Sequence, residues 1–271
     1  MSEARLPTLF IPHGGGPCFF MEPPRGMPDP WKSLGDHLRG IGATIGQQPR
    51  AVLVVSGHWE ESQPTVTAAV APPLIYDYYG FPPHTYQLRY PAPGAPRLAA
   101  EIRLRLDQAG IPSAGDDIRG FDHGVFIPFL LIYPDADIPI VQLSLLASLD
   151  PAAHLAVGRA LQPLRDEGVL IVGSGLSFHN LRGFFTEDPR IAADAESFDQ
   201  WLTQAVTDPD PARREAALTA WAAAPGARTS HPREEHLLPL MVAAGAAGED
   251  AGTLTYRDHI FGKAVSSYRF G

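Results

Sequence analysis

The apolar run AVLVVS at Ala51–Ser56 constrains the fold more than any other segment of the chain. It is rich in β-branched residues, carries no charge, and is followed by Gly57 and His58. A continuous apolar run of this length is typical of a strand that is buried on both faces of a sheet. Helices must then cover both faces of that sheet, so the run predicts an α/β fold.

Similar apolar runs alternate with segments of helical periodicity along the chain. Asp150 followed by Pro151 indicates a helix start, and Gly168 indicates its end. Strands that alternate with helices favour a parallel sheet. We therefore expect residues 1–271 to form a single catalytic domain of α/β class, with a central mostly parallel or mixed sheet flanked by helices on both faces. The predicted strands are 6–12, 51–56, 65–70, 138–144 and 169–173, and the predicted helices are 96–109, 151–167, 191–206 and 211–224.

Charge and cysteine content exclude several classes of function. The formal net charge of −9 offers no counterion release on DNA or RNA, so nucleic acid is not an expected partner. There is no basic run and no apolar stretch of membrane-spanning length, so no membrane partner is expected either. Cys18 is the single cysteine, and the N-terminus lacks the pattern of a signal peptide. We therefore expect a cytoplasmic protein.

Three of the ten histidines follow apolar strands. His13 directly follows a predicted strand, His58 follows another after Gly57, and His179 follows a third after a few residues. Ligands of open α/β sheets bind outside the carboxyl ends of the strands. Imidazoles delivered to one sheet edge by separate strands are a recurring way to build a metal site. A catalytic site of this kind, a closed four-histidine site and a chain without metal are the alternatives that spacing leaves open.

Two further histidines stand in unusual surroundings. His123 lies between Gly120 and Gly124, which permit close approach of the backbone to a ligand. His236 stands near the start of a predicted helix, five residues after His231. Five residues turn a helix by roughly 140°, so at most one of these two should bind the metal.

Other features allow competing interpretations. The aromatic segment at 72–94 is either a packed surface loop or the wall of a pocket for a flat substrate, and His84 within it is a candidate for substrate contact. Trp59 is either a substrate contact or a core residue. The sequence HGGG at His13 matches an esterase oxyanion hole, but the chain has no G-x-S-x-G elbow to accompany it.

Six motifs occur in an order that resembles the 4,5-DOPA extradiol dioxygenase family, within the class III (LigB-like) extradiol ring-cleavage dioxygenases. The resemblance runs from about Leu6 to the C-terminal strand and is weakest between Phe184 and Thr229. The motifs are PHGGGP, SGHWE, GFDHGVFIPF, YPDADIPIVQLS, GSGLSFHNL and HPREEHLLPL.

The resemblance implies roles for five histidines. His13, His58 and His236 would bind a non-haem metal. His179 would be the catalytic base beside the metal, and His123 a catalytic acid or hydrogen-bond donor. Related enzymes carry a glutamate as the third ligand, whereas His236 stands at the matching position here.

The resemblance also implies the chemistry. The chain would be an oxidoreductase of aromatic compound metabolism that inserts O₂, as co-substrate, into a small catechol. One divalent metal is expected per chain, Fe(II) for turnover, with Zn(II) also accepted by three imidazoles. No organic cofactor is predicted, and a homodimer is a candidate assembly. The alternatives are a zinc-dependent hydrolase on the same scaffold and a non-catalytic metal-binding protein.

Overall fold

The computed structural model describes residues 5–23, 25–26 and 28–271. The first four residues, part of the N-terminal segment considered above for a targeting signal, lie outside the described residues. Among those described, no helix is long and apolar enough to cross a membrane.

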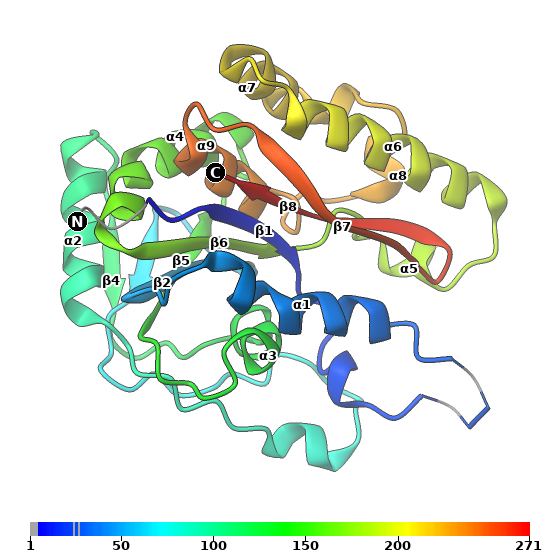
Figure 1. The fold of residues 1–271 in the computed structure, drawn as a ribbon, viewed down its shortest axis with the longest axis horizontal. Coiled ribbons are helices and arrows are strands. Elements are labelled where there is room, and N and C mark those ends of the chain that lie inside the picture. Colours follow the sequence, from blue (N-terminus) through cyan, green and yellow to red (C-terminus); the bar gives the residue numbers. More distant parts are fainter. Residues whose placement is uncertain (1–4, 24, 27) are drawn as a thin grey trace.

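An eight-stranded mixed sheet forms the centre of the molecule, in the order β4-β3-β5-β2-β6-β1-β8-β7 (Figure 1). The central strands β5, β2, β6 and β1 run parallel, and the C-terminal hairpin of β7 and β8 joins β1 antiparallel. The strands are β1 (Thr8–Pro12), β2 (Ala51–Glu61), β3 (Thr65–Thr67), β4 (Ala114–Asp116), β5 (Ile140–Leu146), β6 (Val169–Gly175), β7 (Gly252–Ile260) and β8 (Lys263–Phe270).

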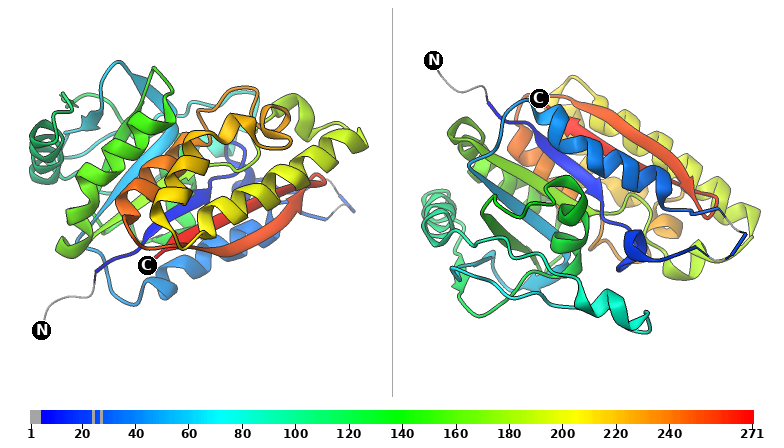
Figure 2. Two further views of the ribbon diagram at one scale, coloured as in Figure 1. Left: turned by 90° about the horizontal axis from the view of Figure 1, so that it is seen from above. Right: turned by 60° about the horizontal axis from the view of Figure 1, so that its bottom comes forward.

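Helices cover both faces of the sheet, as predicted (Figures 1 and 2). Helices α4, α6 and α9 pack on one face, and α1 and α3 pack on the other. The helices are α1 (Lys32–Ile45), α2 (Pro96–Gln108), α3 (His123–Ile132), α4 (Pro151–Leu161), α5 (Leu181–Phe184), α6 (Pro189–Thr207), α7 (Pro211–Thr219), α8 (Ala227–Ser230) and α9 (Leu238–Ala247).

Strand β2 shows why the central strands carry uninterrupted apolar runs. Leu53 and Val55 belong to the core beneath α4 and α9. Val52 and Val54 belong to the core beneath α1 and α3. Because successive side chains point to opposite faces, a strand between two helical layers needs apolar residues at every position.

Several predicted boundaries were wrong by a few residues. Strand β2 continues to Glu61 instead of ending before Gly57, and β3 ends at Thr67 instead of Val70. The helix predicted over 151–167 becomes a 3-10 helix from Gln162, because Pro163 lacks the backbone N–H of a regular helical turn. The start of α4 is as predicted, with the Asp150 side chain accepting a hydrogen bond from Ala152 N at 3.0 Å.

Helices α1 and α3 were not among the helices predicted from the sequence. Three glycines at 35, 40 and 42 weaken the intrinsic helix propensity of α1. Packing of Leu34, Leu38 and Ile41 into the core compensates for this weakness. Helix α3 is apolar on nearly every side, so its sequence has no polar face to reveal the helical repeat.

Candidate metal centre

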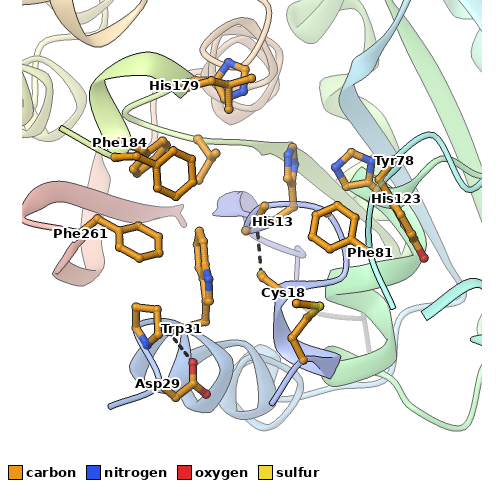
Figure 3. A pocket seen from close by; sticks show the side chains of 18 of the residues that line it. His13, Cys18, Asp29, Trp31, Tyr78, Phe81, His123, His179, Phe184 and Phe261 are labelled. Atoms are coloured by element: carbon orange, nitrogen blue, oxygen red, sulfur yellow. Dashed lines mark hydrogen bonds between the residues drawn. The ribbon is translucent and has the colours of Figure 1, made fainter. Parts of the chain in front are cut away.

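Five histidines converge at the carboxyl ends of the parallel strands. His13, His58, His123, His179 and His236 all line one cavity of about 720 Å³ (Figure 3). They come from segments far apart in the sequence, and the convergence of histidines at this sheet edge is what the sequence predicts.

His13, His58 and His123 are placed by regular elements. His13 follows β1 directly, and its backbone N–H donates to Gly175 O on β6. His58 lies inside β2, beside a register shift between Val55 and Glu60, and not after the strand's end as predicted. His123 is the first residue of α3, which begins after the N-cap Asp122.

His179 and His236 lie on loops that glycines bring close to the sheet. His179 donates its backbone N–H to Ser230 O, and Leu176 N donates to His236 O. A Cβ at Gly175 would overlap that His236 carbonyl, so only glycine lets this loop lie against β6. His236 precedes α9 by two residues, so it is not part of the helix.

Three imidazoles meet nitrogen to nitrogen. His58 Nε2 lies 3.1 Å from His13 Nε2 and 3.2 Å from His236 Nε2. Nitrogens that share an ion at about 2.0–2.1 Å are expected roughly 3.0–3.4 Å apart. The spacing therefore fits a common metal ion.

The opposite nitrogens of His13 and His236 have partners that fix the tautomers. Ser174 donates its hydroxyl to Gly124 O, so its oxygen accepts from His13 Nδ1–H at 3.1 Å. His236 Nδ1 donates to Glu235 Oε1 at 3.0 Å. Both rings therefore present an Nε2 lone pair to His58, which has one Nε2 proton at most. The contacts cannot all be hydrogen bonds, and a cation satisfies them.

Burial keeps these imidazoles neutral, which is the form that binds metals. It lowers the pKa of His13 and of His236 well below the usual value, and repulsion from neighbouring imidazoles adds to the effect. Burial, together with repulsion from His123, lowers the pKa of His58 to about 3 despite the nearby Asp77 carboxylate. Neutral imidazole suits both Fe(II) and Zn(II).

Two carboxylates orient the remaining histidines and were not predicted as site residues. Glu235 Oε1 lies 3.0 Å from His179 Nδ1 as well as from His236 Nδ1. The two rings stack with centroids 3.4 Å apart. Asp77 Oδ1 accepts from both the backbone N and Nδ1 of His123, at 2.9 and 2.8 Å. For Glu235, adjacency to His236 was a signal in the sequence. Asp77 lies in the aromatic segment, where no sequence signal marked it as a site residue.

The same hydrogen bonds keep both carboxylates ionised. Burial favours the protonated acid, but the hydrogen bond from His123 lowers the pKa of Asp77 below its usual value. The hydrogen bond from His179 does the same for Glu235. Carboxylates in this position fix the orientation of the imidazole ring.

Among the described residues there are two groups of potential ligands, and within each group the ligand atoms all lie within 4.8 Å of one another. One contains His13, His58 and His123, and the other contains His179, Glu235 and His236. The short contact between the Nε2 atoms of His58 and His236 joins them. His123 meets His58 ring against ring, with centroids 3.9 Å apart, whereas the nitrogen-to-nitrogen contacts connect His13, His58 and His236.

His231 is buried, and it belongs to neither group of potential metal ligands. Its Nε2 donates to Ser177 O at 2.9 Å, and its ring packs against Phe198 and Trp221. The helical argument used to separate it from His236 was wrong, because both residues lie between α8 and α9. Different loop contacts separate the two side chains.

His231 should make the metal-free protein sensitive to acid. Burial lowers its pKa from 6.5 to about 3. Between these values the unfolded chain binds one more proton, so the free energy of unfolding falls as pH decreases. His231→Gln should reduce that slope by about 1.4 kcal/mol per pH unit. Denaturant unfolding at a series of pH values measures this, and an unchanged slope would contradict the assignment.

The remaining candidates fall outside the centre. Trp59 is buried and does not line the cavity, which favours the core interpretation. His84 Nε2 contacts Phe20 O, also outside the cavity. Cys18 lines the cavity, but burial raises the pKa of its thiol, so it behaves as a small apolar residue. The aromatic segment does form cavity wall, through Tyr78 and Phe81 (Figure 3).

A protein-family model and several known proteins match this chain over nearly its whole length. A family model described as the catalytic LigB subunit of aromatic ring-opening dioxygenase matches residues 7–270. A dioxygenase named tasH from Hapsidospora irregularis is 41% identical, over 98% of this chain and 85% of the relative.

Two further relatives carry the name 4,5-DOPA dioxygenase extradiol. The Beta vulgaris protein is 42% identical over 83% of this chain and 84% of its own length. The Escherichia coli K12 protein is 38% identical over 91% and 87%. A crystal structure of an uncharacterized protein from Escherichia coli K12 matches with a TM-score of 0.76 and 33% identity, covering 98% of this chain and all of that one.

Proposed function

Because this chain belongs to the family of catalytic LigB subunits of aromatic ring-opening dioxygenases, we propose that it opens a catechol ring with O₂ at a metal held by His13, His58 and His236. The observation that carries the ligand set is the pair of Nε2–Nε2 contacts at 3.1 and 3.2 Å. Enzymes of this family use a non-haem metal. A zinc hydrolase and a non-catalytic metal-binding protein are not favoured, since the relatives are named as dioxygenases.

Fe(II) is the metal we propose for turnover. When bound, it would supply Lewis acidity toward the catechol oxygens and one-electron redox capacity toward O₂. Zn(II) would fit three neutral imidazoles as well, but it has no redox chemistry of its own. Protein loaded with Zn(II) should therefore bind substrate without turnover, whereas protein loaded with Fe(II) should do both.

His179 is proposed as the base that removes a catechol hydroxyl proton. Its Nδ1 faces Glu235, so its Nε2 is the nitrogen left to accept a proton from substrate. Glu235 would stabilise the resulting imidazolium, because an ionised carboxylate 3.0 Å away offsets its charge. Holding the base in one orientation lowers the entropic cost of reaching the geometry for proton transfer.

His123 is proposed as the acid or hydrogen-bond donor on the other side of the substrate. Asp77 holds both its backbone N–H and its ring, and Tyr78 lies against the ring at 5.8 Å between centroids. Tyr78 and Phe81 of the aromatic segment line this side of the cavity and would present an apolar surface to the reacting ring.

Oxygen uptake distinguishes the proposed reaction from hydrolysis. Protein loaded with Fe(II) under anaerobic conditions should consume one O₂ for each catechol after air is admitted, with formation of a yellow semialdehyde. Zn(II)-loaded protein should bind catechol and consume no O₂. Substrate conversion without O₂ uptake would contradict the proposed function.

A further inference from the structure

The cavity is much larger than the ring that the metal centre would hold. Ligand sites of about 300–1,000 Å³ enclose molecules of drug size. At about 720 Å³, this cavity retains most of its space when a single catechol ring lies beside the histidines. The remaining space is therefore large enough to hold a second part of the substrate.

Four aromatic residues from three separate segments, Trp31, Phe184, Phe185 and Phe261, form what we call the aromatic wall. Phe261 packs edge to face on Trp31 and Phe184, with centroids 5.9 and 6.4 Å apart, and lies 5.3 Å from Phe185. Trp31, Phe184 and Phe261 lie on the side of the cavity opposite Tyr78, Phe81 and His123 (Figure 3). Phe185 is 76% exposed in spite of its size.

The backbone at Phe261 is unusual for an aromatic residue. Phe261 and Gly262 have φ values of 49° and 74° and form the two-residue turn between Ile260 and Lys263. Turns with positive φ at both central positions favour Asn or Gly at the first. An aromatic side chain is unfavourable there, and a strained residue at a cavity points to a function for its side chain.

A buried lysine connects two segments of the wall. Lys263 is 3% exposed, and its ammonium donates to Phe184 O, Thr186 O and Phe261 O at 3.2, 2.6 and 2.9 Å. These carbonyls belong to the end of α5, to the residues just after it, and to the β7–β8 turn. Lys263 therefore fixes two of the three segments of the wall relative to each other.

The charges around the cavity do not suit an acidic substituent. Glu22 and Asp29 line it, and none of its described lining residues is lysine or arginine. The cations near the wall in sequence are already engaged or face away: Lys32 is exposed and pairs with Asp36, and the Lys263 ammonium donates to three backbone carbonyls. Arg182 is exposed and lines a neighbouring hollow. A carboxylate placed on the wall would lose water and gain no cationic partner.

We propose that the substrate is a catechol with an uncharged apolar substituent of arylalkyl size, which packs on the aromatic wall. This assignment rests on the proposed function, because the metal centre fixes the position of the catechol ring. The aromatic wall then selects the substituent by burying its apolar surface. The carboxylates of Glu22 and Asp29 disfavour a carboxylated analogue.

Binding to Zn(II)-loaded protein tests the assignment without turnover. Calorimetry would compare 4-propylcatechol, 4-(3-phenylpropyl)catechol and 3-(3,4-dihydroxyphenyl)propanoate. The phenyl group should strengthen binding by about 10- to 100-fold. The propanoate should bind about tenfold more weakly than its propyl isostere. Equal affinities for the two alkyl catechols, or tighter binding of the acid, would overturn the proposal.

This experiment separates the two proposals. If the phenylpropyl compound binds best but the Fe(II)-loaded protein opens no ring, the proposed function fails and the ligand class stands. If the ring is opened and the propanoate is preferred in binding, the ligand class fails and the proposed function stands.

Phe261→Asn separates the effect of the aromatic wall on ligand binding from the effect of residue 261 on the stability of the turn. Asn suits the left-handed position, so the melting temperature should rise. The preference for phenylpropyl over propyl catechol should nevertheless fall about fivefold or more. Tyr79→Asn is the matched control, since Tyr79 is 91% exposed and does not line the cavity. It should keep the wild-type preference, and an unchanged preference in Phe261→Asn would overturn the proposal.

Discussion

Replacing His58 with alanine is expected to abolish metal binding and, with it, ring cleavage. His58 is the central imidazole, because its Nε2 contacts the Nε2 atoms of both His13 and His236. Loss of a residue that only supports a ligand already weakens metal affinity by about 10- to 100-fold. Loss of the central ligand should weaken it further, so metal analysis of the purified variant should find none above background.

His231→Gln is the control for this variant. His231 is as deeply buried as the candidate ligands, but its ring bonds to Ser177 O and not to the cluster. It should retain the metal content of the wild type. If His58→Ala retained a full complement of metal, the site would have to be rebuilt around His179, Glu235 and His236, which form the other group of potential ligands.

Replacing His179 with alanine is expected to remove turnover while leaving the metal bound. The proposed ligands His13, His58 and His236 remain, and Glu235 still holds His236. A positioned general base contributes about 10²- to 10⁴-fold, so kcat should fall by that factor. Parallel measurement of metal content and O₂ uptake separates the two effects.

Two further measurements sharpen the role of His179. Added imidazole should restore part of the activity of His179→Ala, because a small base can enter the space that the side chain leaves. His84→Ala should behave as the wild type, since His84 is exposed and does not line the cavity. Absence of metal from His179→Ala would instead identify His179 as a ligand.

The central sheet could be predicted because its signal is local. Residues 51–55 and 169–173 carry no polar side chain, and each forms part of a strand covered by helices on both faces. Helices α2 and α6 were predicted to within two residues, whereas α7 ends at Thr219 instead of the predicted Ala224. Helix α3 was not predicted, because a helix buried on nearly all sides has no polar positions to mark its repeat.

The histidines could be nominated from sequence, but their environment could not. Motif order and strand ends pointed to His13, His58, His123, His179 and His236, which the fold brings to one cavity. Ser174, Asp77 and Glu235 give these rings their orientation. Ser174 and Asp77 lie far along the chain from the histidines they contact, and Glu235 bridges His179 and its own neighbour.

The sequence by itself determined the alternation of the central strands with helices, the family and the candidate metal ligands. Only the tertiary structure decided which nitrogens face one another, and that Trp31, Phe184 and Phe261 meet in one wall. The physical reason is the distance along the chain over which each kind of information acts. Periodicity reports the burial of each element over neighbouring residues, whereas a site consists of contacts between segments that come together only when the whole core packs.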